Sequence, residues 1–435
     1  MDRLRPAVLT CLAALGLLSA ACSSFGSSFS SRSPSGLAQR APEELHEIVP
    51  PSYSTYASDP LLAPQPEGVA AVVDRTVVRL LSERGDTFRA DGRLVQLATW
   101  VATRDEVPAD GSVLDAMSHR VGHAGPTLWL VFVRDSNVTE ALIEGAMRRQ
   151  LEAVPRNFPI TRYGVGTARI AAGGGGDIVA IAFGPVELEL DPVPKQVARN
   201  EALHLRGVVG DRFTRSTVAI TRPDGTVRTF ESRSRSFAMD YVVTDVGLYR
   251  VELFGQGSSG PVVVANLPVY VDVHEPDPPA RTPATSQESA TALTPALADQ
   301  RMLTLLAEAR AEAHLPSLIE DEELSALARS HSEDMGDHGF FGHVSPTTGT
   351  TEERFRRAKL LLPLYGENVA QGDSPEMAHR VLMDSPGHRA NMLDGRFTHV
   401  GIGSVVRPDA FGHRMLTVTL TFGRRPTSIP RRSGK

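Results

Sequence analysis

The chain has 435 residues and a formal net charge of −6, and this mild excess of acid gives no electrostatic basis for binding nucleic acid. Its length predicts about three domains of roughly 150 residues each. It has two cysteines, Cys11 and Cys22. If Cys11 is removed with a leader and Cys22 carries a lipid, the mature protein has neither a disulfide nor a cysteine metal site. Each domain must then be stabilised by its own hydrophobic core.

The first 21 residues have the pattern of a secretory signal peptide. Two arginines precede an apolar stretch, residues 7–21, that is too short to span a bilayer comfortably. Small residues before Cys22 resemble a bacterial lipobox with Cys22 as the acylated first residue, although Leu18 lies four positions before the cysteine instead of the usual three. The alternative is ordinary cleavage that leaves Cys22 free. Ser23 follows in place of the aspartate of inner-membrane lipoproteins, so we expect an exported protein anchored to the outer membrane, on a face that the sequence does not decide.

Segments of biased composition divide the rest of the chain. Residues 22–64 are rich in Ser, Pro and Ala, and residues 275–297 include EPDPPARTPATSQESATALTPA. Both are predicted to be flexible linkers. Residues 425–435 form a basic tail. Three globular segments remain, at residues 65–184, 185–274 and 298–424.

The first globular segment is predicted to be an α+β domain. It opens with VAAVVDRTVVRLLSER, apolar at helical spacing, and closes with TRYGVGTARIAAGGGGDIVAIAFG, the pattern of a β-hairpin. Its DGRLVQLATWVATRD resembles DEELSALARSHSEDM near the C-terminus, and its final hairpin resembles THVGIGSVVRPDAFGHRMLTVTLTFG. Because the matched segments keep their order, we interpret residues 65–184 as a degenerate copy of the C-terminal domain. His119 and His123 lie in neither matched segment.

The central segment is strand-like throughout and is predicted to be an all-β domain. Pro223-Asp224-Gly225 has the composition of a hairpin turn. Tyr249 follows Gly247 in DVGLYRVELF, which resembles the tyrosine-corner strand of immunoglobulin-like sandwiches. The segment has no constellation of His, Asp and Glu, so we expect it to act in spacing or protein contact.

The C-terminal segment alternates between helical and strand patterns. Residues 302–313 and 322–335 are amphipathic, an irregular middle follows, and Ser374-Pro375 and Ser385-Pro386 are each an N-cap with proline at the first helical position. Residues 416–422 alternate as a strand does. Helices packed on a small antiparallel sheet predict an α+β sandwich.

Five motifs in this segment resemble the bacterial branch of the CAP superfamily of cysteine-rich secretory, antigen 5 and pathogenesis-related proteins. They are ARAEAHLPSLIEDEELSALARSHSEDM, HGFFGHVSP, YGENVAQG, DSPGHRANML and FTHVGIGSV, within residues 302–423. The resemblance implies an α-β-α sandwich whose central cleft holds two histidines and one or two acids, here His343, Glu367 and His388. Ser385 falls near the family's second glutamate, and Glu376 is the nearest candidate for it, although a first-turn position already explains Glu376. Residues 65–184 would then be a degenerate CAP-like copy.

The residues themselves support a site around Glu367. This carboxylate follows an apolar run that should be buried, and a buried carboxylate is costly unless it is paired. His343 and His388 are the proposed partners, and together they could hold Zn²⁺ or another divalent cation, although two protein ligands alone make a weak site. Glu367 would then orient a ring or act as general base on a metal-bound water.

Several of these residues also have ordinary structural explanations. His343 could cap a loop, Glu367 could satisfy backbone N–H groups, and Asn368 is expected to be a loop hydrogen-bonder. Arg389 is a possible partner of Glu367.

Three functions remain open at this point. The first is an envelope protein that binds a lipid, peptide or glycan in the cleft without catalysis. The second is a metal-assisted hydrolase of peptide or peptidoglycan bonds that uses His343, His388 and Glu367. The third is a surface interaction or adhesion protein in which the two N-terminal domains make the contacts. The lipid anchor would attach any of them to the membrane.

Overall fold

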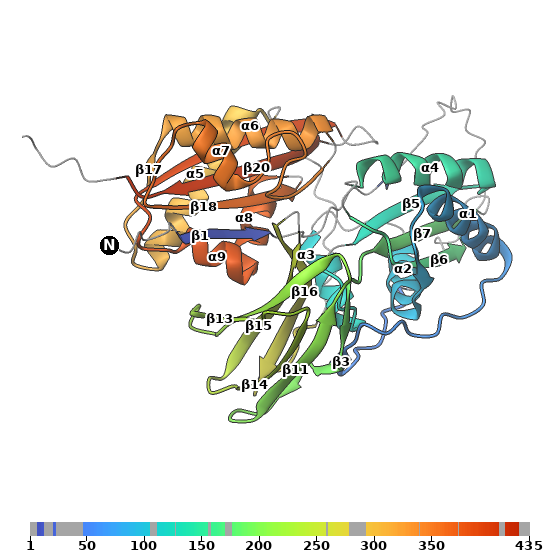
Figure 1. Ribbon diagram of the computed structural model, residues 1–435. Helices are drawn as coiled ribbons and strands as arrows, with labels where there is room; N and C mark the ends of the chain where they lie inside the picture. The colour runs from blue at the N-terminus through green and yellow to red at the C-terminus, as the bar shows by residue number, and fades with distance from the viewer. Residues whose placement is uncertain are drawn as a thin grey trace, which may run out of the picture.

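The structure is a computed structural model with three domains (Figure 1). It describes residues 7–12, 21–22, 47–104, 111–126, 128–154, 158–169, 176–257, 260–277, 293–338, 340–372, 374–408 and 414–425. Most of the predicted first linker, residues 278–292 of the second linker and residues 426–435 of the basic tail lie outside this part of the chain. None of the helices within the described part is long and apolar enough to span a membrane.

The first domain is a five-stranded sheet covered by helices on both faces. Its strand order is β2-β5-β7-β6-β4. One core lies between the sheet and helices α1 and α4, and a second lies between the sheet and helices α2 and α3. The bounds are β2 (Ala21–Cys22), α1 (Gly68–Arg84), β4 (Arg89–Ala90), α2 (Gly92–Arg104), α3 (Gly111–Arg120), β5 (Trp129–Asp135), α4 (Glu140–Ala153), β6 (Arg162–Arg169) and β7 (Asp177–Gly184). The hairpin predicted around the glycine cluster is confirmed by the antiparallel pairing of β6 and β7.

The central domain consists of two sheets that enclose one apolar core. One has the order β10-β16-β15-β12-β13 and the other β14-β11-β8. Tyr249 is buried and its hydroxyl accepts hydrogen bonds from the backbone N–H groups of Thr244 and Asp245 at 3.1 and 3.0 Å. The strands are β8 (Leu188–Leu190), β9 (Val193–Pro194), β10 (Gln196–Val197), β11 (Ala202–Val209), β12 (Phe213–Thr221), β13 (Val227–Glu231), β14 (Ser236–Val242), β15 (Gly247–Gly257) and β16 (Gly260–Val271).

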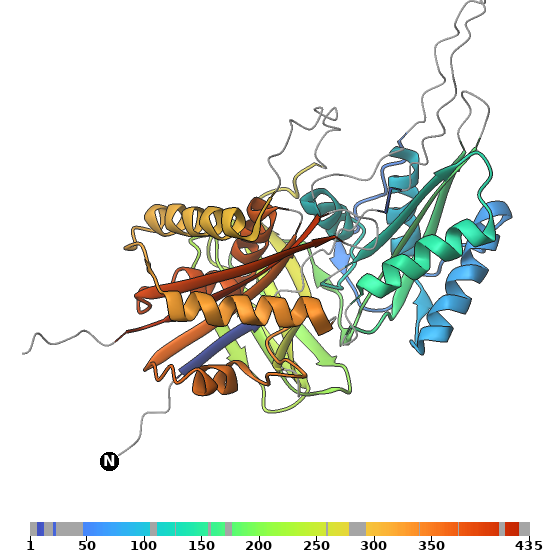
Figure 2. The same ribbon diagram turned by 90° about the horizontal axis from the view of Figure 1, so that it is seen from above.

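The C-terminal domain is an α-β-α sandwich. Alternate residues of β20 face α5, α8 and α9 in one core, and α6 and α7 cover the opposite face. Figure 2 shows the long helices α5 and α6 running alongside this sheet. The elements are α5 (Pro295–Glu312), β17 (Ile319–Glu320), α6 (Glu322–His338), α7 (Thr351–Arg357), β18 (Leu364–Gly372), α8 (Pro375–Asp384), α9 (Pro386–Met392), β19 (His399–Pro408) and β20 (Arg414–Gly423).

The predicted irregular middle of this domain is therefore wrong in two places, because it contains helix α7 and strand β18. Helix α7 begins with a reciprocal capping box between Thr350 and Glu353. Strand β18 is buried along most of its length although it contains Glu367 and Asn368. The strand was not predicted because a buried strand is expected to be apolar, and this one contains two polar residues.

The first and third domains share one sheet topology. The C-terminal sheet has the order β1-β18-β20-β19-β17, with β1 (Ala7–Leu12) at one edge. Strand by strand, its parallel and antiparallel pairings are those of β2-β5-β7-β6-β4. In both domains a helix packs onto glycines of the corresponding strand. A Cβ atom added at Gly166 would lie 2.1 Å from the backbone nitrogen of Thr99, and one at Gly403 would lie 2.1 Å from that of Arg329.

The residues nearest the N-terminus pair with both of these sheets. β1, drawn in dark blue, runs parallel to β18, and β2 runs parallel to β5. β1 also contacts α9 and β16. It therefore lies where the C-terminal and central domains meet, along the edge of the strand that contains Glu367.

The predicted flexible linker at residues 22–64 needs correction over residues 47–64. Strand β3 (Thr55–Tyr56) pairs with β9 of the central domain. Tyr56 is fully buried and its hydroxyl donates to the carbonyl oxygen of Pro268 at 2.8 Å. The backbone of Leu61 is bonded to Asp91 and Gly92 of the first domain. Composition predicted a tether, but an aromatic anchor and backbone hydrogen bonds hold this segment against two domains.

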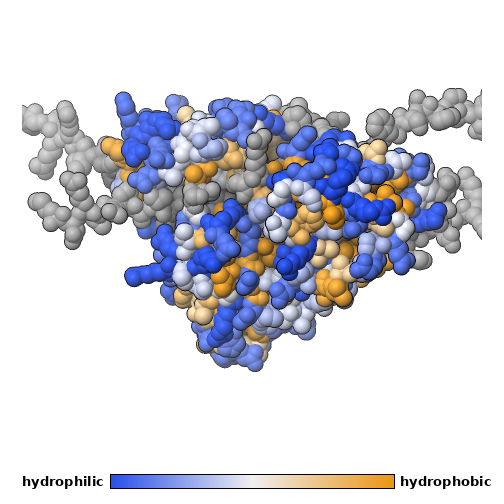
Figure 3. Space-filling view, turned by 45° about the vertical axis from the view of Figure 1, so that its right-hand side comes forward, coloured by the Kyte–Doolittle hydropathy of each residue, from blue (hydrophilic) through white to orange (hydrophobic). Residues whose placement is uncertain are grey.

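The face drawn in Figure 3 presents both hydrophilic and hydrophobic residues. Hydrophobic residues occur there in small groups among hydrophilic ones. Scattered groups of this kind are normal on a soluble protein surface. Hydrophobicity on this face therefore does not mark a binding site. The candidate site residues are instead polar side chains of the C-terminal domain.

Candidate functional site

Glu367 lies on β18 with 1% of its surface exposed. Both carboxylate oxygens accept hydrogen bonds from Nη2 of Arg354, at 2.7 and 2.6 Å. Oε1 also accepts from Thr351 at 3.0 Å and lies 2.8 Å from Nδ1 of His343. Burial of the carboxylate is thus compensated by a cation and by two further polar groups, as a buried charge requires.

Arg354 is the central residue of this cluster and was missed in the sequence. It is buried on α7, and its Nη1 donates to the carbonyl oxygens of His343 and Gly349, both at 2.8 Å. It thereby fastens the loop before α7 to Glu367. Arg389, which the sequence offered as a further partner besides the two histidines, belongs to α9 instead. The capping-box residues before Arg354 could have revealed the helix, but not which way its arginine points.

His343 is held in place from two sides. Gly342 before it has φ of 145°, a conformation that L side chains rarely adopt, and this lets the loop turn at the imidazole. Asp334 on α6 anchors the rest of the loop, accepting hydrogen bonds from Ser345, from Thr347 at 2.6 Å and from Thr348 at 3.0 Å. The loop is therefore built to present a fixed ring to Glu367.

The charge of the cluster is concentrated on one ion pair. Burial alone would raise the pKa of Glu367, but Arg354 and then His331 and His343 outweigh it and hold that pKa far below its usual range. His331 lies on α6 with Nε2 3.8 Å from Glu367 Oε1 and 2.9 Å from the carbonyl oxygen of Gly342. Its burial lowers its pKa to about 4, so its ring is neutral near pH 7. Glu367 is consequently ionised and already engaged.

His388 lies on the other side of the sheet from the Glu367 carboxylate. It is fully buried on α9, and its Nδ1 is 2.7 Å from Oγ of Ser385. Asn368, the next residue after Glu367 on β18, donates to the carbonyl oxygen of His388 at 3.0 Å and accepts from Asn391 at 2.8 Å. Successive strand residues face opposite ways. The structure thus joins His343 to Glu367, and joins His388 to Ser385.

These residues lie within a segment with known relatives. Residues 303–421 match the family described as CAP, the cysteine-rich secretory protein family. The C-terminal domain is a CAP domain. The expected α-β-α fold of this domain is confirmed.

Two proteins of Bacillus subtilis (strain 168) are similar to part of this chain. YkwD is 34% identical over 131 residues, which are 29% of this chain and 51% of YkwD. The membrane protein YlbC is 32% identical over 107 residues, which are 24% of this chain and 31% of YlbC. The chain thus spans about half the length of the first relative and about a third of the second.

Among solved structures, an extracellular protein containing an SCP domain from Bacillus anthracis shares 21% identity. The match covers 55% of this chain and 86% of that one, with a TM-score of 0.27.

A carboxylate from the neighbouring domain reaches the CAP domain at Ser385. Glu252 on β15 is fully buried, and its Oε2 accepts from Ser385 Oγ at 3.1 Å and from the N–H of Gly387 at 3.3 Å. Ser385 was expected to cap α9, but its side chain makes no cap hydrogen bond and lies between Glu252 and His388 instead. The predicted cap at Ser374 is confirmed, because its side chain accepts from the N–H of Met377.

Glu376 is not placed with the other candidate residues of the CAP domain. Its side chain is 56% exposed and accepts a hydrogen bond from Arg301 at 2.7 Å. It therefore stabilises the packing of α8 against α5 at the surface, where an exposed ion pair contributes little.

The side chains predicted to hold a cation in the CAP domain are engaged in other contacts. Across the described residues, no group of three or more His, Cys, Asp and Glu side chains is arranged to hold a metal ion. The Glu367 carboxylate accepts from Arg354, and the two histidines predicted as ligands, His343 and His388, contact Glu367 and Ser385 respectively, on opposite faces of the sheet. We therefore derive no step through a metal.

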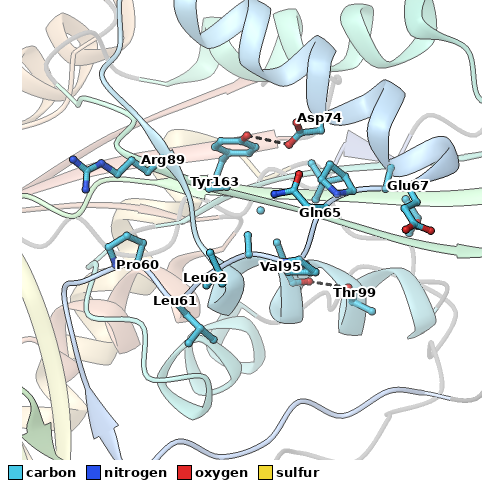
Figure 4. Close-up of a pocket in the computed structure, with 18 residues that line it drawn as sticks. Pro60, Leu61, Leu62, Gln65, Glu67, Asp74, Arg89, Val95, Thr99 and Tyr163 are labelled. Carbon is cyan, nitrogen blue, oxygen red and sulfur yellow. Dashed lines mark hydrogen bonds between the residues drawn. The ribbon is translucent and has the colours of Figure 1, made fainter.

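A separate cavity of about 680 Å³ lies in the first domain (Figure 4). It is bounded by the extended residues 60–67 on one side and by α1, α2 and β6 on the other. Tyr163 donates to Asp74 across it at 2.9 Å. None of the described residues that line it is a histidine, so its chemistry differs from that of the CAP domain.

Proposed function

We propose that this protein is an exported protein of the bacterial cell envelope whose CAP domain binds an extended peptide along the edge of β18. The observation that carries the proposal is the pairing of β18 with β1, in register from Ala7 with Leu364 to Leu12 with Val369. This edge accepts an extended segment between Glu367 and His343 on one side of the sheet and His388 on the other. Backbone pairing of this kind favours a peptide over a lipid or a glycan.

Removal of the predicted signal peptide would free this edge. Residues 7–12 belong to that predicted segment, so the mature chain would lose β1. β18 would then offer unpaired N–H and C=O groups beside α9 and β16, which β1 contacts. Unpaired edges of this kind are templates for a further strand. A ligand strand would replace the hydrogen bonds that β1 makes.

The state of Glu367 favours binding over hydrolysis. A general base needs a pKa near the working pH and a free lone pair. Glu367 has a pKa far below its usual range, and Arg354 donates to both of its oxygens. It acts better as the fixed anchor of the loop that contains His343. The hydrolase hypothesis therefore loses its proposed base.

The first domain is proposed to be a CAP-like copy without this site. The shared strand order and the glycine contacts support the duplication. In register, Leu130 pairs with Ala182 in the first domain as Glu367 pairs with Thr421 in the CAP domain. Leu130 is buried among apolar residues of α2 and α3. A leucine at this position cannot anchor a loop through an ion pair.

Export and anchoring also belong to the proposal. We propose that Cys22 is acylated after the signal peptide is removed. Similarity to a protein named as a membrane protein and to one named as extracellular agrees with export. Mass spectrometry of the mature N-terminus, compared with that of Cys22→Ser, would show the lipid; an unmodified wild-type Cys22 would contradict the anchor.

Peptide binding is tested with the mature chain, which starts at residue 22. The probe is a synthetic peptide with the sequence of residues 7–12, in which serine replaces Cys11. Isothermal titration calorimetry should detect binding. A backbone N-methylated peptide of the same sequence is the matched control, because it keeps the side chains but loses the backbone donors. Equal binding of both peptides, or binding of lipid or glycan instead, would refute strand addition. Capture of a partner by the two N-terminal domains alone would favour adhesion.

A further inference from the structure

Among the described residues, no cation pairs with the buried carboxylate of Glu252. Along β15, Val251 and Leu253 point into the core of the central domain, and Glu252 points outward, where the CAP domain covers it. Within the part of the chain that the structure describes, its buried Oε1 accepts no hydrogen bond, and its Oε2 accepts from Ser385 and Gly387. A buried carboxyl group with only some of its hydrogen bonds formed destabilises the fold. Its presence at this contact therefore suggests a role other than stability.

We infer that Glu252 is a positioning residue of the CAP site: through Ser385 it fixes the tautomer of His388. The three groups form a chain, with 3.1 Å between Glu252 Oε2 and Ser385 Oγ and 2.7 Å between Ser385 Oγ and His388 Nδ1. The site is therefore completed by the central domain. The inference rests on the proposed function in taking His388 as a wall of the peptide groove.

The hydroxyl of Ser385 has one proton, and this makes the chain directional. A protonated Glu252 donates to Ser385, Ser385 donates to Nδ1 of His388, and the ring proton lies on Nε2. An ionised Glu252 can only accept, so Ser385 donates to it and accepts from Nδ1–H, which leaves Nε2 as an acceptor. Each charge state of the acid thus selects one tautomer.

The surroundings favour the protonated acid near neutral pH. Burial raises the pKa of Glu252 to about 8, against the opposing hydrogen bonds from Ser385 and Gly387. Charged and titratable groups on this side of the contact include Arg250 on β15, Asp384 at the end of α8 and Arg389 on α9, and His119 on α3 lies near Arg250. Arg250 and Asp384 pair with each other at 2.7 Å. None of these groups is among the causes that shift the pKa of Glu252.

The test is long-range ¹H–¹⁵N NMR of the full chain labelled on histidine nitrogens, with the His388 signal assigned as the one missing from His388→Gln. At pH 6.5 the wild type should show the Nε2–H tautomer. Glu252→Gln should keep it, because its amide can donate to Ser385. Glu252→Leu and Ser385→Ala should lower the share of the Nε2–H tautomer relative to the wild type. Between pH 7 and 9 the wild type should change tautomer, and Glu252→Gln should not.

Asp384→Asn is the matched control, since it breaks the adjacent ion pair with Arg250 but leaves Glu252 and Ser385 in place. Its His388 signal should equal that of the wild type. If Asp384→Asn shifts the signal as much as Glu252→Leu does, domain docking alone sets the ring and the inference fails. An unchanged signal in Glu252→Leu, or a wild-type tautomer that ignores pH, also overturns it. No ligand is needed, so the result is separate from the outcome of peptide binding.

Discussion

At the scale of single residues, the CAP domain depends on one buried ion pair. Arg354 neutralises Glu367 and also fastens the loop that presents His343. Removing one partner of such a pair leaves a buried charge without compensation, which typically costs about 3–5 kcal/mol. The contact between Glu367 and His343 could be predicted because their motifs resemble those of the CAP family. The ion pair with Arg354 could not be predicted, because no local sequence pattern indicates the direction in which an arginine side chain points from a helix.

Arg354→Met is expected to destabilise the CAP domain by about 3–5 kcal/mol. Both tryptophans lie in the first domain, so hydrogen exchange of the β18 amides, measured by mass spectrometry, is the appropriate probe. Exchange should become much faster. Arg356→Ala on the same helix is the control, since its side chain is 70% exposed and should change stability by less than about 0.5 kcal/mol. Similar exchange in the two variants would show that the ion pair is dispensable.

The buried acids predict opposite responses to pH. The folded-state pKa of Glu252 is raised to about 8, so its contribution to stability is fully present below its unfolded pKa and is lost as pH rises through 8. The pKa of Glu367 is lowered, so its contribution is present above its unfolded pKa and is lost as pH falls. Urea midpoints should decline from pH 5 to 8 in the wild type but less in Glu252→Gln. A parallel decline in the two proteins would count against this role for Glu252.

At the scale of elements, the close approach of α6 to β19 is set by glycine. A Cβ at Gly403 would lie 2.1 Å from a backbone nitrogen of α6, so Gly403→Ala must push the helix away. We expect a loss of about 3 kcal/mol or more in the free energy of unfolding, measured by urea denaturation followed by circular dichroism. Gly395→Ala is the control, because its Cβ would meet only a leucine methyl group at 3.5 Å. Equal stability of the two variants would contradict this packing.

Elements with strong local signals could be predicted, and those specified by distant partners could not. The β6–β7 hairpin and the serine cap of α8 followed from turn and cap chemistry. Strand β18 did not, because its polar residues make sense only beside Arg354 and Asn391, which lie elsewhere in the chain. Ser385 is a residue type that commonly caps helices, but its hydroxyl donates a hydrogen bond to Glu252, 133 residues away, instead.

At the scale of the whole molecule, residues 47–64 join the first and central domains. A chain that starts at residue 47 should therefore be more stable than one that starts at residue 65, the boundary that composition predicted. Tyr56→Ala should cost about 3–5 kcal/mol, because it empties a fully buried aromatic site. Thermal unfolding followed by the fluorescence of Trp100 and Trp129 measures both effects. If both starting points gave the same midpoint, the segment would be a tether after all.

The contact between Glu252 and Ser385 has a practical consequence for anyone who studies the CAP domain by itself. A fragment cut at the second linker would retain every family motif and still fold around its own core. It would also expose Ser385 to water, and the neighbouring domain would no longer set which nitrogen of the imidazole at position 388 carries the proton. Ligand affinities measured on such a fragment would describe a different binding site from the one in the intact protein.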